Sequence, residues 1–256
     1  MKRLAIVGGA GRMGQALARG LAARDEFAVV ALIDEHPIAP LAGAICASDV
    51  SALDPSTVDV VIDFSSPRGV LASASWCSAH AVALVVGTTG LTDEHWSALE
   101  AAGQRVGVVV AANFAIGAVL AERFAAMAAP YFERVEIIEL HHEQKVDAPS
   151  GTAIATARAI AGARRAKGRA LIEDPTTRFS VEGARGADVE DGVKVHSVRL
   201  SGLVAHQEVL FGSPGEGLTI RHDSYDRESF LPGVAIAVAH VSATTPELLR
   251  GIDSLL

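Results

Sequence analysis

LAIVGGAGRMG, residues 4–14, decides the fold of this chain. Four apolar residues run into glycines at positions 8, 9, 11 and 14, and a helical pattern follows from Met13 to Ala23. Small residues permit a sharp turn and let the backbone approach a pyrophosphate, while the amide groups at the helix N-terminus attract phosphate charge. The stretch predicts a strand, a tight turn and a helix that together bind a dinucleotide.

Glycine-rich turns also occur without a ligand, so the motif depends on its context. The second apolar run ends at Asp34, twenty residues beyond Gly14, where a dinucleotide-binding unit places an acid on the adenosine ribose. Asp34 would accept hydrogen bonds from a 2′-hydroxyl and repel a 2′-phosphate, and Glu35 rather than an arginine follows it. We therefore expect NADH as the preferred cofactor. NADPH is kept as a second cofactor because His36 and Arg12 offer positive charge.

Short apolar runs alternate with helical patterns over the first 110 residues. Runs of this kind, without polar alternation, are typical of parallel strands covered on both faces. We predict an α/β fold with a Rossmann-like, doubly wound parallel sheet. The predicted strands are 4–7, 28–34, 58–64, 81–86 and 105–111, and the predicted helices are 13–23, 67–80 and 92–103. Pro67 suits a first helical turn and Thr92 suits an N-cap.

The pattern changes after an apolar helix predicted at 114–131. A strand at 134–140 precedes a polar loop and a helix at 152–165, and residues 166–192 show no clear period. Long alternating runs follow, which indicate an antiparallel sheet with one face in water. The alternating runs are 193–200, 203–211 and 218–225, with a turn at 212–217.

The chain closes with an apolar helix predicted at 229–242 and a short helix from Pro246. We therefore divide it into a dinucleotide-binding domain at 1–113, an inserted α+β substrate-binding and oligomerisation domain at 114–227, and C-terminal helices at 228–256 that return to the first domain.

Composition excludes several classes of protein. The 256 residues carry 22 Lys and Arg against 30 Asp and Glu, a net charge of −8 that argues against nucleic-acid or anionic-membrane partners. Cys46 and Cys77 lack metal-ligand or CxxC spacing, so neither a disulfide framework nor a zinc site is expected. No run approaches the roughly 18 apolar residues of a membrane-spanning helix. We expect a cytoplasmic protein without a metal.

Three further segments follow predicted strands, at the edge where such a sheet binds ligands. They are Asp63–Ser66, Gly87–Gly90 and Ala112–Phe114. Helix capping and turn formation explain the same residues equally well. Both interpretations stay open at this point.

A cluster of basic side chains follows the strand at 134–140. His141, His142 and Lys145 precede Ser150, which is followed by a glycine and a threonine at a helix start. Helix amides and a lysine can hold a carboxylate, and a histidine can exchange a proton near neutral pH. The alternative is a solvated loop with Ser150 as an N-cap. A metal site is a poorer interpretation, because adjacent strand side chains point to opposite faces.

Residues 139–152, ELHHEQKVDAPSGT, resemble the signature of the dihydrodipicolinate reductase family. The stretches 8–14, 85–90, 111–114 and 221–227 also resemble that family, in the right order. The resemblance implies an NAD(P)H-dependent reduction of the cyclic imine dicarboxylate formed from 4-hydroxy-tetrahydrodipicolinate, in lysine biosynthesis through diaminopimelate. It also implies a homotetramer assembled through the inserted sheet.

By the same resemblance, His141 is the general acid, Lys145 assists at the ring nitrogen or supplies a proton, and His142 contacts the substrate. The resemblance also implies that Ser150, Gly151 and Thr152 bind the substrate carboxylates. The implied cofactor residues are Gly8, Gly9, Ala10, Gly11, Arg12, Met13, Asp34, Gly87, Thr88, Thr89, Ala111, Ala112, Asn113 and Phe114. Some family members have histidine at the position of Gln144 and arginine at that of Glu35. The absence of that arginine here argues against strong NADPH use.

Other functions share this architecture. A semialdehyde dehydrogenase needs a reactive cysteine, and neither Cys46 in a loop nor Cys77 in an Ala/Ser-rich helix suits that role. A relative that reduces a similar imine acid is a closer alternative. A dinucleotide-sensing regulator would need a DNA-reading element, and the most basic stretch, 164–169, is better explained as a solvated helix end.

Overall fold

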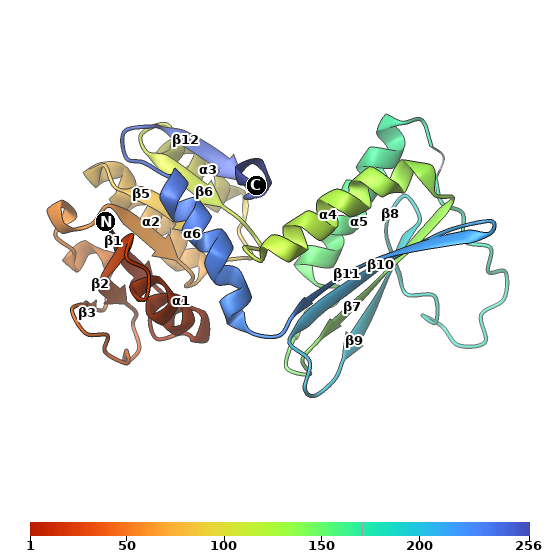
Figure 1. Cartoon of the computed structure of the whole chain (residues 1–256), viewed down its shortest axis with the longest axis horizontal. Coiled ribbons are helices and arrows are strands. Elements are labelled where there is room, and N and C mark those ends of the chain that lie inside the picture. The colour runs from red at the N-terminus through yellow and green to blue at the C-terminus, as the bar shows by residue number, and fades with distance from the viewer. Residues whose placement is uncertain (170) are drawn as a thin grey trace. The chain divides into compact units, whose positions relative to one another are not determined.

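The computed structural model describes residues 1–169 and 171–256 (Figure 1). These residues form two compact units. Unit 1 comprises residues 1–115 and 227–256, and unit 2 comprises residues 116–226. The end of the chain thus belongs to the same unit as its first strand. The functional roles assigned to the three predicted domains stay predictions.

A seven-stranded sheet forms the centre of unit 1. Its strands are β1 (Lys2–Val7), β2 (Phe27–Ile33), β3 (Ile45–Ala47), β4 (Val60–Asp63), β5 (Ala83–Val86), β6 (Gly107–Val110) and β12 (Glu247–Arg250). Their order is β12-β6-β5-β4-β1-β2-β3, and all the pairings between them are parallel. The chain leaves β1 toward β2 and later returns to β4 on its other side, so the carboxyl end of β1 is a topological switch point.

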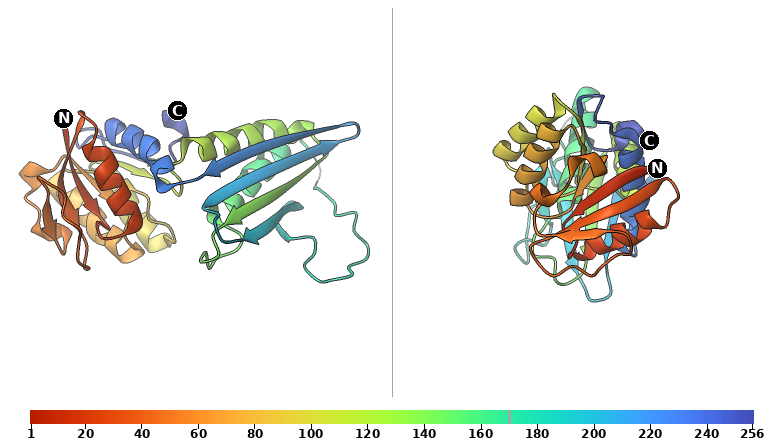
Figure 2. Two further views of the ribbon diagram at one scale, coloured as in Figure 1. Left: turned by 60° about the horizontal axis from the view of Figure 1, so that its bottom comes forward. Right: turned by 90° about the vertical axis from the view of Figure 1, so that its left-hand side faces the viewer.

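Helices cover both faces of this sheet (Figures 1 and 2). On one face, α1 (Arg12–Ala22) packs with α6 (Leu231–His240). On the other face, α2 (Pro67–His80) packs with α3 (Asp93–Gly103). The arrangement confirms the predicted Rossmann-like, doubly wound sheet and the return of a C-terminal helix to it.

The starts of α2 and α3 follow their capping residues. Ser66 precedes α2 and its hydroxyl accepts the N–H of Gly69, while Pro67 occupies the first turn, where no backbone donor is needed. Thr92 precedes α3 in an extended conformation, and its N–H donates to His95 Nδ1 at 3.1 Å. Local sequence is therefore sufficient to place both helix starts.

The central strands of unit 1 are buried throughout. Every residue of β4, β5 and β6 is buried, which explains why their apolar runs show no polar alternation. Lys2 in β1 extends its ammonium group to the carboxyl end of α6, where it donates to the carbonyls of Val238 and Val241 at 2.7 Å each. These contacts satisfy carbonyl groups that a helix end leaves without partners.

A second, five-stranded sheet forms unit 2. Its strands are β7 (Arg134–His141), β8 (Ala187–Glu190), β9 (Val193–Arg199), β10 (Ala205–Ser213) and β11 (Glu216–Ser224), in the order β11-β10-β7-β9-β8. The helices α4 (Ile116–Ala128) and α5 (Gly151–Ala166) cover one face of this sheet (Figure 1). Val135 and Ile137 of β7 are buried against that side.

The prediction of a wholly antiparallel sheet is wrong for β9. β9 pairs parallel with β7, with His141 opposite Arg199, and antiparallel with β8. The chain passes from β7 through α5 to β8, and the short turn between β8 and β9 reverses its direction, so β9 runs the same way as β7. Alternation of polar and apolar residues reports one covered face but not strand direction. The turn is also shorter than predicted, since β10 ends at Ser213 and β11 begins at Glu216.

Two short strands replace other predicted features of unit 1. Residues 247–250 form β12 rather than a helix, because they pair with β6 at an edge whose backbone groups need partners. Cys46 lies in the edge strand β3 rather than in a loop. In unit 2, β8 lies inside the stretch 166–192 that was predicted as irregular. Pairing with a neighbouring strand forms each of these elements, and single-sequence periodicity does not detect such pairing.

Short 3-10 turns complete the described chain. They are η1 (Val50–Ala52), η2 (Pro55–Thr57), η3 (Ala129–Tyr131), η4 (Arg227–Phe230) and η5 (Asp253–Leu255). The helices in the described part of the chain are all too short or too polar to cross a membrane.

Candidate active site

The glycine-rich turn at the end of β1 has no room for a side chain at Gly8 or Gly14. Gly8 has a φ of +88°, and a Cβ there would lie 2.4 Å from the carbonyl oxygen of Phe64. A Cβ on Gly14 would lie 2.1 Å from the carbonyl oxygen of Gly8. The helix α1 thus packs directly on the turn, which is the reason for glycine in a dinucleotide-binding unit.

The start of α1 fits a phosphate group. Gly11 is the N-cap residue, so no side chain competes for the first amide groups of the helix. Gly11 and Arg12 are exposed, and Ala10 and Met13 are half-buried. The exposed helix N-terminus, with Arg12 beside it, can hold the charge of a pyrophosphate.

Asp34 stands directly after β2 and faces the glycine turn. Its Oδ2 accepts the N–H of Ala10 at 3.0 Å, and its Oδ1 accepts the N–H of His36 at 2.9 Å. Burial alone would raise the pKa of Asp34, but the hydrogen bonds from His36 and Ala10 outweigh it and lower the pKa. The carboxylate is therefore charged at neutral pH. The neighbouring Glu35 forms an ion pair with Arg68 at the start of α2.

The loop after β5 is held by a hydrogen bond to a buried carboxylate. Thr88 is buried, and its hydroxyl donates to Oδ1 of the fully buried Asp63 at 2.9 Å. Asp63 also accepts hydroxyl hydrogen bonds from Ser65 and Ser73. The Thr88 side chain is thus committed to the loop, and its backbone and the exposed Thr89 are the groups that remain for a ligand.

The aromatic ring of Phe64 also supports this loop, together with the segment after β6. Gly87 lies against Phe64, since a Cβ there would fall 2.1 Å from the ring. Phe64 in turn packs on Phe114, which is fully buried, at a centroid distance of 5.6 Å. Ala111 is also buried, so among the predicted residues 111–114 only Ala112 and Asn113 reach the surface of unit 1.

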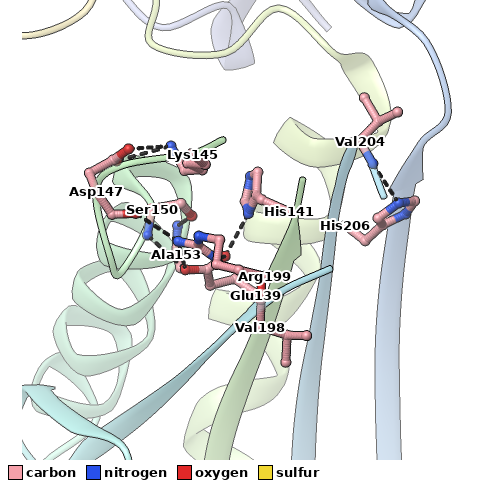
Figure 3. Close-up of polar contacts among 10 residues, drawn as sticks. All are labelled: Glu139, His141, Lys145, Asp147, Ser150, Ala153, Val198, Arg199, Val204 and His206. Carbon is pink, nitrogen blue, oxygen red and sulfur yellow. Dashed lines mark hydrogen bonds and ion pairs between the residues drawn. The ribbon is translucent and has the colours of Figure 1, made fainter. Parts of the chain in front are cut away.

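In unit 2, the end of β7 carries a histidine and a glutamate on one face (Figure 3). Glu139 is fully buried, and its Oε2 lies 2.5 Å from Nδ1 of His141. Residues two apart in a strand share a face, which explains the contact. Because a carboxylate only accepts, Nδ1 is the donor and Nε2 of His141 is left for other partners.

Arg199 completes the pairing of Glu139. Its two terminal nitrogens lie 2.8 Å from the two carboxylate oxygens, and it also donates to the carbonyl of Asp147 at 2.7 Å. The N–H of Ser150 adds a further hydrogen bond to Glu139 at 3.1 Å. Burial would raise the pKa of Glu139, but its hydrogen bonds with His141 and Arg199 lower the pKa to about 2.

Lys145 and Asp147 form an ion pair in the loop beyond β7. Lys145 Nζ lies 2.8 Å and 2.9 Å from the two carboxylate oxygens of Asp147 (Figure 3), and this hydrogen bonding lowers the pKa of Asp147. The ammonium group is partly buried, whereas the carboxylate is mostly exposed. A bound anion can therefore reach Lys145 by displacing Asp147 into water.

The helix α5 begins beside this loop. The hydroxyl of Ser150 accepts the N–H of Ala153 at 3.2 Å, so Ser150 caps the helix, as the alternative interpretation of this loop expects, and its substrate-binding role stays a prediction. Ser150 is buried, whereas Gly151 is exposed and Thr152 is half-buried. The helix start thus presents the backbone of Gly151 and Thr152 to a ligand rather than the Ser150 side chain.

The structure gathers the predicted residues into two groups. The predicted cofactor residues lie at the carboxyl edge of the unit 1 sheet, and His141, His142, Lys145 and the α5 start lie together in unit 2. The sequence interpretation missed Glu139 and Arg199, and it named Asp63 only as a candidate ligand residue, whereas the buried Asp63 carboxylate holds Thr88. The two-residue spacing from Glu139 to His141 on a strand was an available signal, whereas Arg199 is remote in sequence.

The cysteines do not form a nucleophilic site. Cys77 is fully buried in α2, and burial, together with the charge of Asp63, raises the pKa of its thiol. Cys46 is exposed on β3 at the far edge of the sheet from β6. Among the described residues, His, Cys, Asp and Glu form no group of three placed to hold a metal ion.

Unit 1 has a doubly wound sheet with a glycine turn and an acid after β2, and unit 2 carries a paired histidine. These features are those of the class of NAD(P)H-dependent oxidoreductases. Two family models divide the chain between them: "Dihydrodipicolinate reductase, N-terminus" matches residues 2–114, and "Dihydrodipicolinate reductase, C-terminus" matches residues 117–256. The chain belongs to the dihydrodipicolinate reductase family.

Three similar proteins match over nearly their whole length. The 4-hydroxy-tetrahydrodipicolinate reductase of Corynebacterium urealyticum is 45% identical over 100% of this chain and 99% of its own. That of Mycolicibacterium vanbaalenii is 48% identical over 99% of this chain and 98% of its own. The solved structure of dipicolinate-bound dihydrodipicolinate reductase from Paenisporosarcina sp. TG-14 is 39% identical, with a TM-score of 0.86 and full coverage of both chains.

Proposed function

We propose that the chain reduces the cyclic imine dicarboxylate formed from 4-hydroxy-tetrahydrodipicolinate to tetrahydrodipicolinate, the step that the names of its relatives describe. One observation carries the proposal: His141, paired with the buried Glu139, stands beside Lys145 and the start of α5. A proton donor and a site for anions thus adjoin one another in unit 2. The proposed place of the reaction is the diaminopimelate route to lysine, in the cytoplasm.

The dinucleotide would be held by unit 1. The close-packed glycines from Gly8 to Gly14 and the uncapped start of α1 fit a pyrophosphate, and Asp34 fits the adenosine ribose. The backbone of the Gly87–Thr89 loop and of Ala112 and Asn113 would surround the nicotinamide. When bound, the reduced cofactor supplies a hydride at C4 of the nicotinamide.

We also propose that NADH is preferred to NADPH. The Asp34 carboxylate is charged at neutral pH and would repel a 2′-phosphate. Arg68 is neutralised by its ion pair with Glu35, which supports the same preference. NADPH would bind more weakly but would not be excluded, because Arg12 and His36 are exposed near the acid.

The dicarboxylate substrate would bind to the positive groups of unit 2. Lys145 and the backbone amides of Gly151 and Thr152 at the α5 N-terminus are suited to carboxylate oxygens, and His142 lies in the same loop. These groups bring positive charge into a protein whose net charge is −8. Fixed charge of this kind is commonly the largest contribution to catalysis.

Proton transfer would fall to His141. Its Nδ1 is held by Glu139, so Nε2 is the nitrogen that would deliver a proton after the hydride has added to the conjugated ring carbon. Lys145 would polarise the substrate at the ring nitrogen or assist in supplying the proton. A neutral His141 with its proton on Nδ1 would remain.

A homotetramer assembled through unit 2 is a further part of the proposal. The face of the five-stranded sheet away from α4 and α5 carries half-buried apolar side chains at Ile138, Leu140 and Leu210. Burial of this face between copies would remove that apolar surface from water. Light scattering on the purified chain would measure the mass of the assembly.

The function is tested by a coupled assay, because the substrate is unstable. Dihydrodipicolinate synthase would generate the substrate in place while the oxidation of NADH and of NADPH is followed at matched concentrations. Rapid oxidation that depends on the synthase supports the reductase, and a higher kcat/KM for NADH supports the assigned preference. NADH binding without any oxidation would refute the proposal and favour a relative with another imine substrate.

A further inference from the structure

Both oxygens of the buried Glu139 carboxylate are held by hydrogen bonds. One oxygen faces His141 Nδ1 at 2.5 Å and Arg199 at 2.8 Å, and the other accepts from Arg199 at 2.8 Å and from the N–H of Ser150 at 3.1 Å. The carboxylate keeps its charge, because the pKa of Glu139 is lowered to about 2. A buried charge held in this way has one fixed orientation.

The contact with Glu139 settles the tautomer of His141. A charged carboxylate requires a proton on Nδ1, which leaves the reactive position to Nε2. The negative charge also stabilises the imidazolium form that a proton donor must take. A carboxylate behind a catalytic histidine acts in this way in other enzymes, without itself becoming protonated.

The same carboxylate reaches the rest of the site through Arg199 and Ser150. Arg199 donates to the carbonyl of Asp147, whose carboxylate holds Lys145, and the Ser150 N–H lies at the start of α5 (Figure 3). The charged groups around His141 are therefore Glu139 on its own strand, Arg199 on β9, and Lys145 with Asp147 in the loop. β10 places the uncharged Ala205 opposite His141.

We propose that Glu139 is a positioning residue that fixes His141 with Nε2 as its reactive nitrogen and, through Arg199, sets the place of the Lys145 loop. The inference rests on the proposed function, since it assumes that His141 delivers the proton. It adds to that function an ion pair between the buried Glu139 and the half-buried Arg199, on which the proton donor depends.

Glu139→Gln tests the proposal because it removes the charge and keeps the shape. We expect kcat to fall by about 10²-fold, while the Kd for NADH, whose proposed site lies in unit 1, stays unchanged. The pH profile of kcat should also change, because the carboxylate that holds His141 no longer carries a charge. A purely structural role for Glu139 would lower the amount of folded enzyme without moving the pH profile.

The chain supplies a matched control in the same unit. Glu190, at the end of β8, accepts a hydrogen bond from Arg165 of α5 at 2.9 Å, so it too is a glutamate paired with an arginine. It belongs neither to the proposed site nor to the proposed assembly face. Glu190→Gln therefore removes a paired carboxylate away from the loop, and we expect its kcat and pH profile to match those of the wild type.

A second variant covers the case in which Glu139→Gln fails to fold with Arg199 left unpaired. The double change Glu139→Gln with Arg199→Met removes both charges and keeps an unbranched apolar side chain in the space. We expect it to fold, to bind NADH and to show the same loss of kcat. Nitrogen NMR of the histidines adds a direct measurement, and His141 in the wild type should carry its proton on Nδ1.

The outcomes separate the two proposals. A wild type that does not oxidise NADH in the coupled assay overturns the proposed function, and this inference with it. An active wild type overturns the inference alone if a folded Glu139→Gln keeps its kcat and pH profile. A proton on Nε2 of neutral His141 in the wild type would also overturn the inference.

Discussion

Acidification should destabilise unit 2 through the Glu139 carboxylate. In the folded chain the pKa of Glu139 is about 2, against an ordinary value of 4.5. Each unit of difference is worth about 1.4 kcal/mol, so ionisation of this one group stabilises the folded state by about 3 kcal/mol at neutral pH. Since the folded pKa is the lower one, this stability is present above about pH 5 and is lost as the pH falls toward about 2.

The assay must report on unit 2 alone. Both tryptophans, Trp76 and Trp96, lie in unit 1, so tryptophan fluorescence would follow the wrong part of the molecule. Urea unfolding monitored by pulse-labelling hydrogen exchange of peptides from β7 would give the free energy of unfolding of unit 2 at each pH. The wild type is compared with Glu139→Gln, because other carboxylates also titrate in both proteins.

The variant should be less stable at neutral pH but should lose less stability on acidification. We expect the gap in unfolding free energy between the two proteins to narrow by about 3 kcal/mol between about pH 6 and about pH 2. Parallel curves for wild type and variant over this range would show that Glu139 does not carry a depressed pKa. That result would refute the reasoning from its burial and hydrogen bonds.

Three further predictions concern ligand binding and turnover. Gly14→Ala should abolish NADH binding in calorimetry, because its Cβ would fall 2.1 Å from the carbonyl oxygen of Gly8; tight binding would refute the assigned turn. Asp34→Asn should raise the ratio of kcat/KM for NADPH over NADH by about tenfold, since one repulsive charge is removed and an acceptor for Ala10 is kept. An unchanged ratio would show that residues other than Asp34 determine the cofactor preference. Lys145→Ala should lower turnover by about 10²-fold or more with little change in NADH affinity, because Lys145 lies outside unit 1. Weakened NADH binding with intact turnover would contradict that assignment.

Local patterns were sufficient for most of unit 1. The glycine turn, the helix starts at Pro67 and Thr92 and the buried strands of the sheet all follow from backbone chemistry and apolar runs that residues close in sequence determine. The family was also within reach of the sequence, because the segment 139–152 is specific and continuous. Its fold followed from that family and from the alternation of strands and helices.

Pairing between remote segments was beyond the sequence. Residues 247–250 become a strand because β6 offers an open edge, and β9 runs parallel to β7 because it forms an antiparallel hairpin with the intervening strand β8. Both outcomes depend on backbone hydrogen bonds between segments far apart in the chain. A pattern read along one stretch contains no information about such partners.

The residues of the candidate site likewise fall into those that the sequence identified and those that only the structure revealed. The sequence alone identified His141 and Lys145, because their chemistry and their place after a strand are visible in one short segment. Only the tertiary structure decided which nitrogen of His141 is held, since that depends on Glu139 and on Arg199, sixty residues further along the chain. The physical reason is burial: a charged carboxylate is stable inside a protein only when its partners converge on it, and folding brings those partners together.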